Sequence, residues 1–105
     1  MDNTRPQPQD GPVPISGLPE RGRVLCQGFI ESVTYVPASQ VAAFTAIVTD
    51  HEGNGRLRVI WLGRRRVPGI DAGTEVRLQG MLTLREGIPT MFNPRYEILS
   101  RQENE

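Results

Sequence analysis

Residues 44–66 read FTAIVTDHEGNGRLRVIWLGRRR and predict a β-hairpin followed by a basic loop. In the first half, apolar residues alternate with a set that includes two threonines, the two-residue period of a strand whose faces differ. Turn-forming residues, two of them glycine, follow over 50–55. The second half alternates again, with Leu57, Val59 and Trp61 on one face and Arg56, Arg58 and Ile60 on the other. A hairpin with arginine on its outer face is typical of a surface that meets phosphates.

The residues before the hairpin predict one long strand over 24–36, VLCQGFIESVTYV. Its inward-facing set is expected to be Val24, Cys26, Gly28 and Ile30. Glycine weakens a strand interior unless a bend or a close backbone approach requires it. Gly28 therefore predicts a bend, and a bent first strand can pair with two partners, as small closed barrels require.

After the hairpin, the sequence predicts further strands but no helix. Residues 64–73, RRRVPGIDAG, contain Pro68-Gly69, which limits any helix to a single turn. A strand over 74–85 (TEVRLQGMLTLR) alternates between inward and outward residues. Gly80 lies in the middle of this strand and predicts a second bend.

A last strand is predicted over 88–99, with an interruption at Asn93-Pro94 that places it at an edge or a bulge. Five strands, no helix and two glycine bends predict an all-β fold, namely a five-stranded OB-fold Greek-key barrel. An SH3-like barrel is the structural alternative. The barrel is expected over 21–99, between a disordered proline-rich arm (1–20) and a polar tail (100–105).

The formal net charge is zero, but the charges are distributed unevenly. Residues 21–99 contain ten arginines and seven acids, a net charge of +3, so the two flanking segments hide a basic body. All twelve basic residues are arginine, which reflects either the codon usage of a GC-rich genome or bidentate contact with phosphate. A basic barrel body is consistent with a nucleic-acid partner.

Enzymatic, metal-binding and membrane functions are not expected. Cys26 is the single cysteine and His51 the single histidine, so neither a catalytic set nor a metal cluster is predicted, and no cofactor is expected. The N-terminus lacks the features of a signal peptide, and no run approaches the roughly 20 apolar residues of a membrane span. The sequence predicts a cytoplasmic protein.

Four motifs follow one another in a recognisable order: Gly28-Phe29-Ile30; Ile47 to Asp50 with Gly55 and Leu57; Gly73 with Val76 to Gly80; and Phe92 to Tyr96. Together they span about residues 23–99 and resemble the OB-fold nucleic-acid-binding domains of bacteria, particularly the wedge domain of the helicase RecG and small stand-alone OB-fold proteins. The turn over 50–55 is longer than the family's usual one, and the chain lacks a GxxxxGK[ST] phosphate loop, so helicase activity is not implied. The resemblance implies a binding surface on the outer face of the second and third strands, flanked by two loops.

The predicted nucleic-acid-binding residues are Phe29, Tyr35, Thr45, Thr49, Arg56, Arg58, Arg64, Arg65, Arg66, Arg77 and Arg85. The arginines are expected to contact phosphates, because three adjacent arginines at 64–66 repel one another unless an anion lies nearby. Phe29 and Tyr35 are candidates for stacking on bases. The alternatives are an ordinary solvated face for the arginines and, for Phe29, packing under residues 93–96 or the arm. Trp61 is expected in the core.

These features predict a non-catalytic module that binds nucleic acid with little sequence preference, single-stranded DNA before RNA. OB barrels also bind proteins and oligosaccharides. The alternative function is therefore an adaptor that docks onto a larger protein partner.

Overall fold

The computed structural model describes residues 11–37 and 39–100 of the chain. Its elements are β1 (Val13–Pro14), the 3-10 helix η2 (Ile15–Gly17), β2 (Gly22–Tyr35), β3 (Ala43–Thr49), β4 (Leu57–Leu62), β5 (Glu75–Arg85), β6 (Ile88–Phe92) and β7 (Arg95–Ser100). The all-β prediction is confirmed, since this part of the chain contains no α-helix. It also contains no helix with the length and apolar character of a membrane span. Most of the predicted tail, and the first ten residues of the predicted arm, lie outside the described residues.

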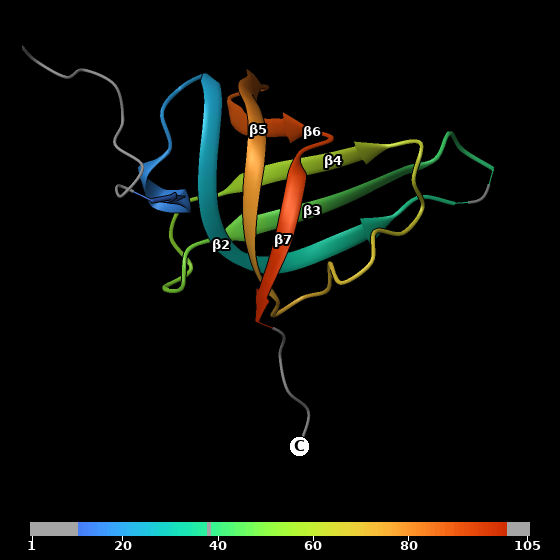
Figure 1. Cartoon of the computed structure of the whole chain (residues 1–105). Coiled ribbons are helices and arrows are strands. Elements are labelled where there is room, and N and C mark those ends of the chain that lie inside the picture. The colour runs from blue at the N-terminus through green and yellow to red at the C-terminus, as the bar shows by residue number, and fades with distance from the viewer. Residues whose placement is uncertain (1–10, 38, 101–105) are drawn as a thin grey trace, which may run out of the picture.

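The strands form one sheet that closes partly into a ring. Their order is β1-β2-β3-β4-β6-β5-β7, and β2 also pairs with β5. β2 pairs with β5 through its first half and with β3 through its second half, and Phe29 takes part in both registers. Figure 1 shows β2 running alongside β5 and then turning to run alongside β3. The ring is completed by a parallel pairing of β4 with β6, over Arg58–Ile60 and Thr90–Phe92.

The turn in β2 has two local causes. Gly28 lies where the strand changes partners, and a Cβ atom there would lie 2.5 Å from both the Ile15 Cγ1 atom and the Thr49 carbonyl oxygen. Glycine is therefore required at this position because the Ile15 side chain and the Thr49 backbone approach it closely. A close backbone approach is one of the two explanations that the sequence analysis gave for a glycine within a strand. The register with β3 then shifts between Ile30 and Ser32, and such an irregularity bends a strand further.

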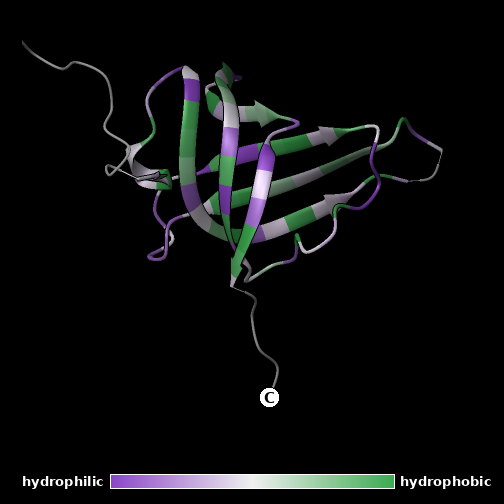
Figure 2. Cartoon of the chain, in the orientation of Figure 1, coloured by the Kyte–Doolittle hydropathy of each residue, from purple (hydrophilic) through white to green (hydrophobic). Residues whose placement is uncertain are grey.

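The core is built from the inward residues of the alternating strands, as Figure 2 shows by the change of colour along each strand. The predicted inward sets are buried: Val24, Cys26 and Ile30 in β2; Leu57, Val59 and Trp61 in β4; Val76, Leu78 and Leu82 in β5. Trp61 is 4 % exposed, and its indole Nε1 donates a hydrogen bond to the Pro94 carbonyl oxygen at 3.3 Å. The prediction that Trp61 belongs to the core is confirmed.

Residues 11–20 belong to the domain, so the prediction of a disordered arm over 1–20 is wrong for this half. β1 pairs in parallel with β2, and Ile15 is 2 % exposed within the core. The hairpin between β3 and β4 packs on the same segment, since a Cβ atom on Gly55 would lie 2.8 Å from the Ser16 Cα atom. The proline-rich composition concealed this packing, because one apolar residue is enough to fill the gap above Gly28.

The predicted last strand over 88–99 is two strands. Asn93 has a left-handed backbone (φ 52°), and Pro94 has no N–H to continue a ladder. β6 consequently pairs with the end of β5 and β7 with its beginning, on the same edge of that strand. The sheet therefore has seven strands in place of the predicted five, with β1 and β7 added to a ring of five.

Candidate nucleic-acid interface

The outer face of β3 and β4 presents two cross-strand rows of side chains. One row contains Thr34, Thr45, Ile60 and Phe92, and the next contains Ser32, Ile47, Arg58 and Thr90. Except for Thr90, which is fully buried, these residues point outward because their neighbours along the strands, such as Ala46 and Val59, are buried in the core. The face thus combines hydroxyl groups, apolar side chains and one arginine. Thr45 and Arg58 are the predicted site residues that lie on it.

Arg58 is held against the turn between β5 and β6. Its Nη2 donates a hydrogen bond to the Arg85 carbonyl oxygen at 3.1 Å and lies 3.6 Å from Glu86 Oε1. The side chain is 24 % exposed, and its buried Nε has no hydrogen-bond partner among the described residues. A guanidinium fixed in this way pays little further entropy when it binds an anion, although Glu86 partly neutralises its charge.

An arginine lies over an aromatic ring beside Arg58. The Arg85 guanidinium carbon is 5.3 Å from the centroid of the partly exposed Phe92 ring. Cation–π contacts of this kind hold a guanidinium close to an aromatic face. Arg85 was a predicted site residue, whereas Phe92 was not.

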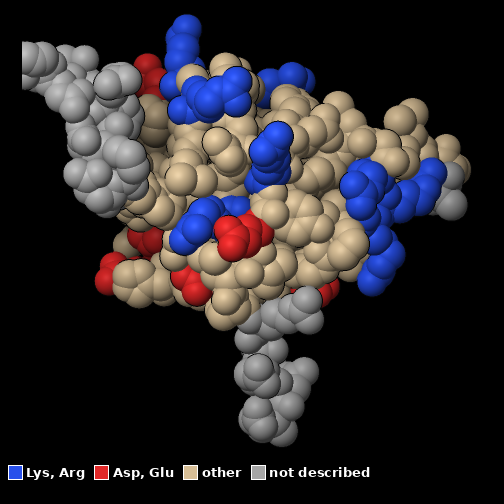
Figure 3. Space-filling model, viewed as in Figure 1, with Lys and Arg blue, Asp and Glu red and all other residues tan. Residues whose placement is uncertain are grey.

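The opposite end of β3 and β4 has a second arginine–aromatic contact. Arg66 lies 5.6 Å from the Tyr35 ring centroid, and Tyr35 is 50 % exposed with its ring edge against the buried Phe44. Figure 3 shows basic side chains gathered where β4 runs into the following loop, and acidic ones mainly near the turn between β3 and β4. Three arginines in a row were expected to need an anion. Arg65 instead donates hydrogen bonds to the carbonyl oxygens of Pro37 and Gln40, at 3.2 and 3.0 Å. These bonds connect the segment after β4 to the segment between β2 and β3.

Two further predicted arginines each lie beside a carboxylate. Arg56 Nη2 is 3.7 Å from Glu31 Oε1, with both side chains well exposed. Arg77 Nη1 is 3.5 Å from Glu97 Oε1 on the outer face of β5 and β7. Exposed pairs of this kind add little stability, but they lower the positive charge available to a phosphate.

Phe29 and Thr49 lie at the acidic end of the molecule. Thr49 is only 6 % exposed, and Phe29 is partly buried beside a hollow of about 330 Å³ that is also lined by Asp50, His51 and Glu75. Gln27 Nε2 donates to Glu75 Oε2 at 3.0 Å in the same hollow. The structure therefore separates Phe29 from Tyr35, and it places two carboxylates, which repel phosphate, in the hollow beside Phe29.

The carboxylate of Asp50 accepts hydrogen bonds within the β3–β4 turn. Its Oδ1 accepts hydrogen bonds from the backbone N–H groups of Glu52, at 2.9 Å, and Asn54, at 2.7 Å. Desolvation alone would raise the pKa of Asp50, but these bonds, one from the Ser16 side chain and the nearby His51 lower it from its ordinary value. The Asp50 carboxylate at this end of the molecule is thus stabilised in its ionised form.

The single cysteine is buried, and the single histidine lies in the β3–β4 turn. Burial raises the pKa of the Cys26 thiol to about 12, which keeps it protonated and unreactive at neutral pH. His51 is exposed and lies 3.6 Å from Glu52 Oε2. No group of three or more metal-ligating side chains occurs in residues 11–37 and 39–100.

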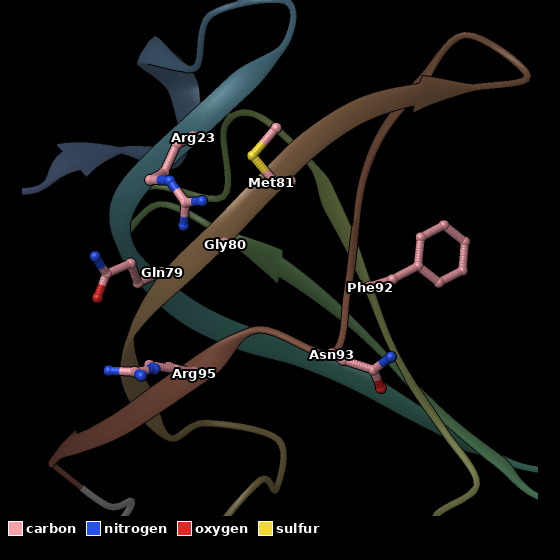
Figure 4. A pocket seen from close by; sticks show the side chains of 7 residues that line it. All are labelled: Arg23, Gln79, Gly80, Met81, Phe92, Asn93 and Arg95. Atoms are coloured by element: carbon pink, nitrogen blue, oxygen red, sulfur yellow. The ribbon is translucent and has the colours of Figure 1, made fainter.

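Sequence reasoning did not single out two arginines that line a hollow of about 470 Å³ next to Phe92. They are Arg23 of β2 and Arg95 of β7, on either side of β5 (Figure 4). The remaining side chains around the hollow include Gln79, Met81 and Asn93. A signal was present for Arg23, because it has the same outward register in β2 as Phe29. The position of Arg95 at the hollow depends on the pairing of β5 with β7, which the sequence does not reveal.

Comparisons of the chain with models of protein families, with curated proteins and with solved structures found no match. The resemblance of the four motifs to OB-fold domains therefore remains a prediction. The side chains on the outer face of β3 and β4 are therefore the basis for inferring a function.

Proposed function

We propose that the chain is an OB-type barrel that binds single-stranded nucleic acid across the outer face of β3 and β4. OB barrels bind their ligands on the second and third strands of the ring and on the loops that join strands one to two and four to five. If β2 is taken as strand one, those strands are β3 and β4, and those loops are the connection between β2 and β3 and the turn at 86–87. The cyclic order of β2, β3, β4, β6 and β5 supports this correspondence.

The observation that supports the proposal most is the pair of arginine–aromatic contacts on opposite sides of this face. Tyr35 with Arg66 lies at the end of β2, and Phe92 with Arg85 lies on β6 and the end of β5. Aromatic rings accept any base by stacking, and arginines follow the phosphates without reading sequence. Arg58 lies in the next outward row after Phe92, on the side away from Tyr35. The expected ligand is a strand with little sequence preference.

The proposal is tested by titration of the purified chain with fluorescent single-stranded and duplex DNA and RNA at two salt concentrations. We expect single strands to bind more tightly than duplexes, because the bases of a duplex are already stacked. The logarithm of affinity should fall with the logarithm of salt by about 0.7 per phosphate contacted. A folded wild-type chain that binds no single strand at low salt would overturn the proposal.

An adaptor function is the second candidate, and exposed apolar side chains favour it. Val41 is 88 % exposed and Leu62 is 54 % exposed, next to the Tyr35 end of the same face. Apolar anchors of this kind are what a protein partner buries at an interface. If the chain is an adaptor, the substitution L62E should abolish binding of a partner protein and leave strand binding intact. If the face binds a nucleic-acid strand, R58A should weaken strand binding and leave binding of a partner protein intact.

A further inference from the structure

The hollow between Arg23 and Arg95 lies on a different side of the barrel from the face of β3 and β4. The register places Arg23 opposite Met81 and Arg95 opposite Gln79, on the outer side of β5. The two arginines are therefore separated by two strand spacings across β5, about 10 Å, and by two residues along it, about 7 Å, which together give about 12 Å between their Cα atoms. Figure 4 shows Gln79 of β5 between the two arginines, which come from the strands on either side of β5.

Both arginines are free to bind a ligand. Arg23 and Arg95 are exposed, and neither has an ion pair or a side-chain hydrogen bond with any other described residue. This distinguishes them from Arg56, Arg58 and Arg77, each of which lies beside a carboxylate. No carboxylate lines the hollow. Two guanidinium groups without counterions attract an anion, and a phosphate has the oxygen geometry that suits them.

The lining of the hollow provides further hydrogen-bond donors. Asn93 is fixed by two bonds, since its backbone N–H donates to the Ile60 carbonyl oxygen and its Oδ1 accepts from the Leu62 N–H, each at 2.8 Å. The Oδ1 atom is thus occupied, and the Nδ2 group remains as a donor. Gln79 is exposed between the arginines and adds another amide. The polar groups that the hollow offers are therefore mainly donors, as an anion requires.

Phe92 connects the hollow to the proposed strand-binding face. It belongs to the row of Thr45 and Ile60 on the outer face, and it also lines the hollow. A strand that crosses β3 and β4 and passes the Phe92 ring reaches the hollow next. We propose that the bound strand continues past Phe92 and that one of its phosphodiester groups binds between Arg23 and Arg95. This inference rests on the proposed function and extends it from one face of the barrel to two.

The test compares R23Q/R95Q with the wild type, using oligothymidylates from about 4 to about 16 nucleotides, the range of site sizes for one OB barrel. R21Q is the control, because Arg21 is exposed and two residues from Arg23 but does not line the hollow. We expect the double variant to bind the longest strand about tenfold more weakly, as for the loss of a charged hydrogen bond. Its salt slope should fall by about 0.7, the contribution of one phosphate. Affinity for the shortest strand should stay unchanged, as should all affinities of R21Q.

The remaining outcomes separate this inference from the proposed function. If R23Q/R95Q binds strands of every length like the wild type, the hollow is not on the path, while the face of β3 and β4 stands. If the double variant loses all lengths equally and R58A loses none, the hollow alone binds nucleic acid, and the proposed continuation is overturned. If inorganic phosphate binds the wild type and not R23Q/R95Q, without any dependence on strand length, the site serves free phosphate and the inference also fails. Because both arginines are exposed, matching thermal midpoints are expected for all variants and serve as the folding control.

Discussion

The two ends of the barrel use their side chains in opposite ways. At the end covered by residues 11–18, Ile15 fills the space above Gly28, and Asp50 and Glu75 line a hollow beside the partly buried Phe29. We call this the packed end. On the arginine side, which comprises the outer face of β3, β4 and β6 with the adjoining hollow, aromatic rings and arginines remain accessible. The difference indicates that the packed end stabilises the fold and the arginine side is available to a ligand.

The largest effect is expected at the packed end, from a side chain at Gly28. A Cβ atom there would lie 2.5 Å from a backbone oxygen, which cannot move aside as a flexible side chain can. We expect Gly28→Val to destabilise the fold by about 3 kcal/mol or more. At Gly80 the nearest atoms would be 3.2 Å away and belong to the Met91 side chain, so Gly80→Val should cost less, about 1–3 kcal/mol. Urea unfolding of both variants checks the order, and equal costs would contradict the assigned role of Gly28.

Truncation of Ile15 tests whether the packed end only stabilises. Ile15→Ala leaves a cavity in the core, and we expect a loss of about 2–4 kcal/mol in the free energy of unfolding. The Cys26 thiol, which is buried and has a raised pKa, should become accessible to alkylation faster in this variant, because its exposure requires opening of the barrel. Affinity for single strands, measured where the variant is folded, should not change. A loss of affinity without unfolding would mean that the packed end takes part in binding.

The arginine side should respond in the opposite manner, through affinity and not stability. Phe92→Ala removes the proposed stacking ring, and we expect a loss of about 1–3 kcal/mol in binding with a nearly unchanged salt slope. Phe29→Ala is the matched control, since its ring lies among carboxylates at the packed end. Fluorescence anisotropy with one oligonucleotide compares the two. A greater loss for Phe29→Ala would restore Phe29 as the stacking residue that the sequence predicts.

Local alternation in the sequence predicted the core, but it did not predict which charged residues meet. Cys26, Trp61 and Leu78 are buried as expected, because the inward or outward direction of a strand residue follows from its neighbours. The ion pairs of Arg56 with Glu31 and of Arg77 with Glu97 depend on strand pairings that join distant segments.

The errors of the prediction have the same origin. The burial of Ile15 depends on Gly28 and Gly55, which come later in the chain, and composition alone therefore suggested an arm. Arg95 was overlooked because the interruption at Asn93-Pro94 predicted a bulge in one strand. In the structure it is the point at which the chain moves along β5 from one pairing to the next.

A charge variant gives a smaller effect on the arginine side. R58A/R85A removes two of the proposed phosphate contacts, and the log–log salt slope should therefore flatten by about 1.4, or twice 0.7. Arg56→Ala is the control, since Arg56 is exposed, lies beside Glu31 and contacts neither Phe92 nor Arg85. Affinity measured at several salt concentrations distinguishes the variants. If Arg56→Ala flattens the slope as much as R58A/R85A does, the charges act at long range and no defined face exists.

The smallest effect is expected from Asp50, which makes the stability of the packed end dependent on pH. Its folded pKa is lower than its ordinary value, so the unfolded chain binds more protons in acid. The stabilisation is complete above the unfolded pKa, about 3.9, and is lost as the pH falls through the lower folded pKa. Asp50→Asn keeps an oxygen that can accept the bonds from Glu52 and Asn54 but does not titrate. Between about pH 3 and about pH 7, a range that spans that pKa, the urea midpoint of the variant should change less than that of the wild type.

Asp71→Asn provides the control for this experiment, because it removes one exposed carboxylate away from the β3–β4 turn. Its urea midpoint should follow the wild type through the acid range. Strand affinity of Asp50→Asn should equal that of the wild type at neutral pH, since the carboxylate lies at the packed end and contacts no residue of the proposed face. If Asp50→Asn instead strengthened strand binding several-fold, the negative charge of Asp50 would be repelling phosphates, and the strand would have to pass over the packed end as well. The separation of the two ends into a stabilising and a binding part would then be wrong.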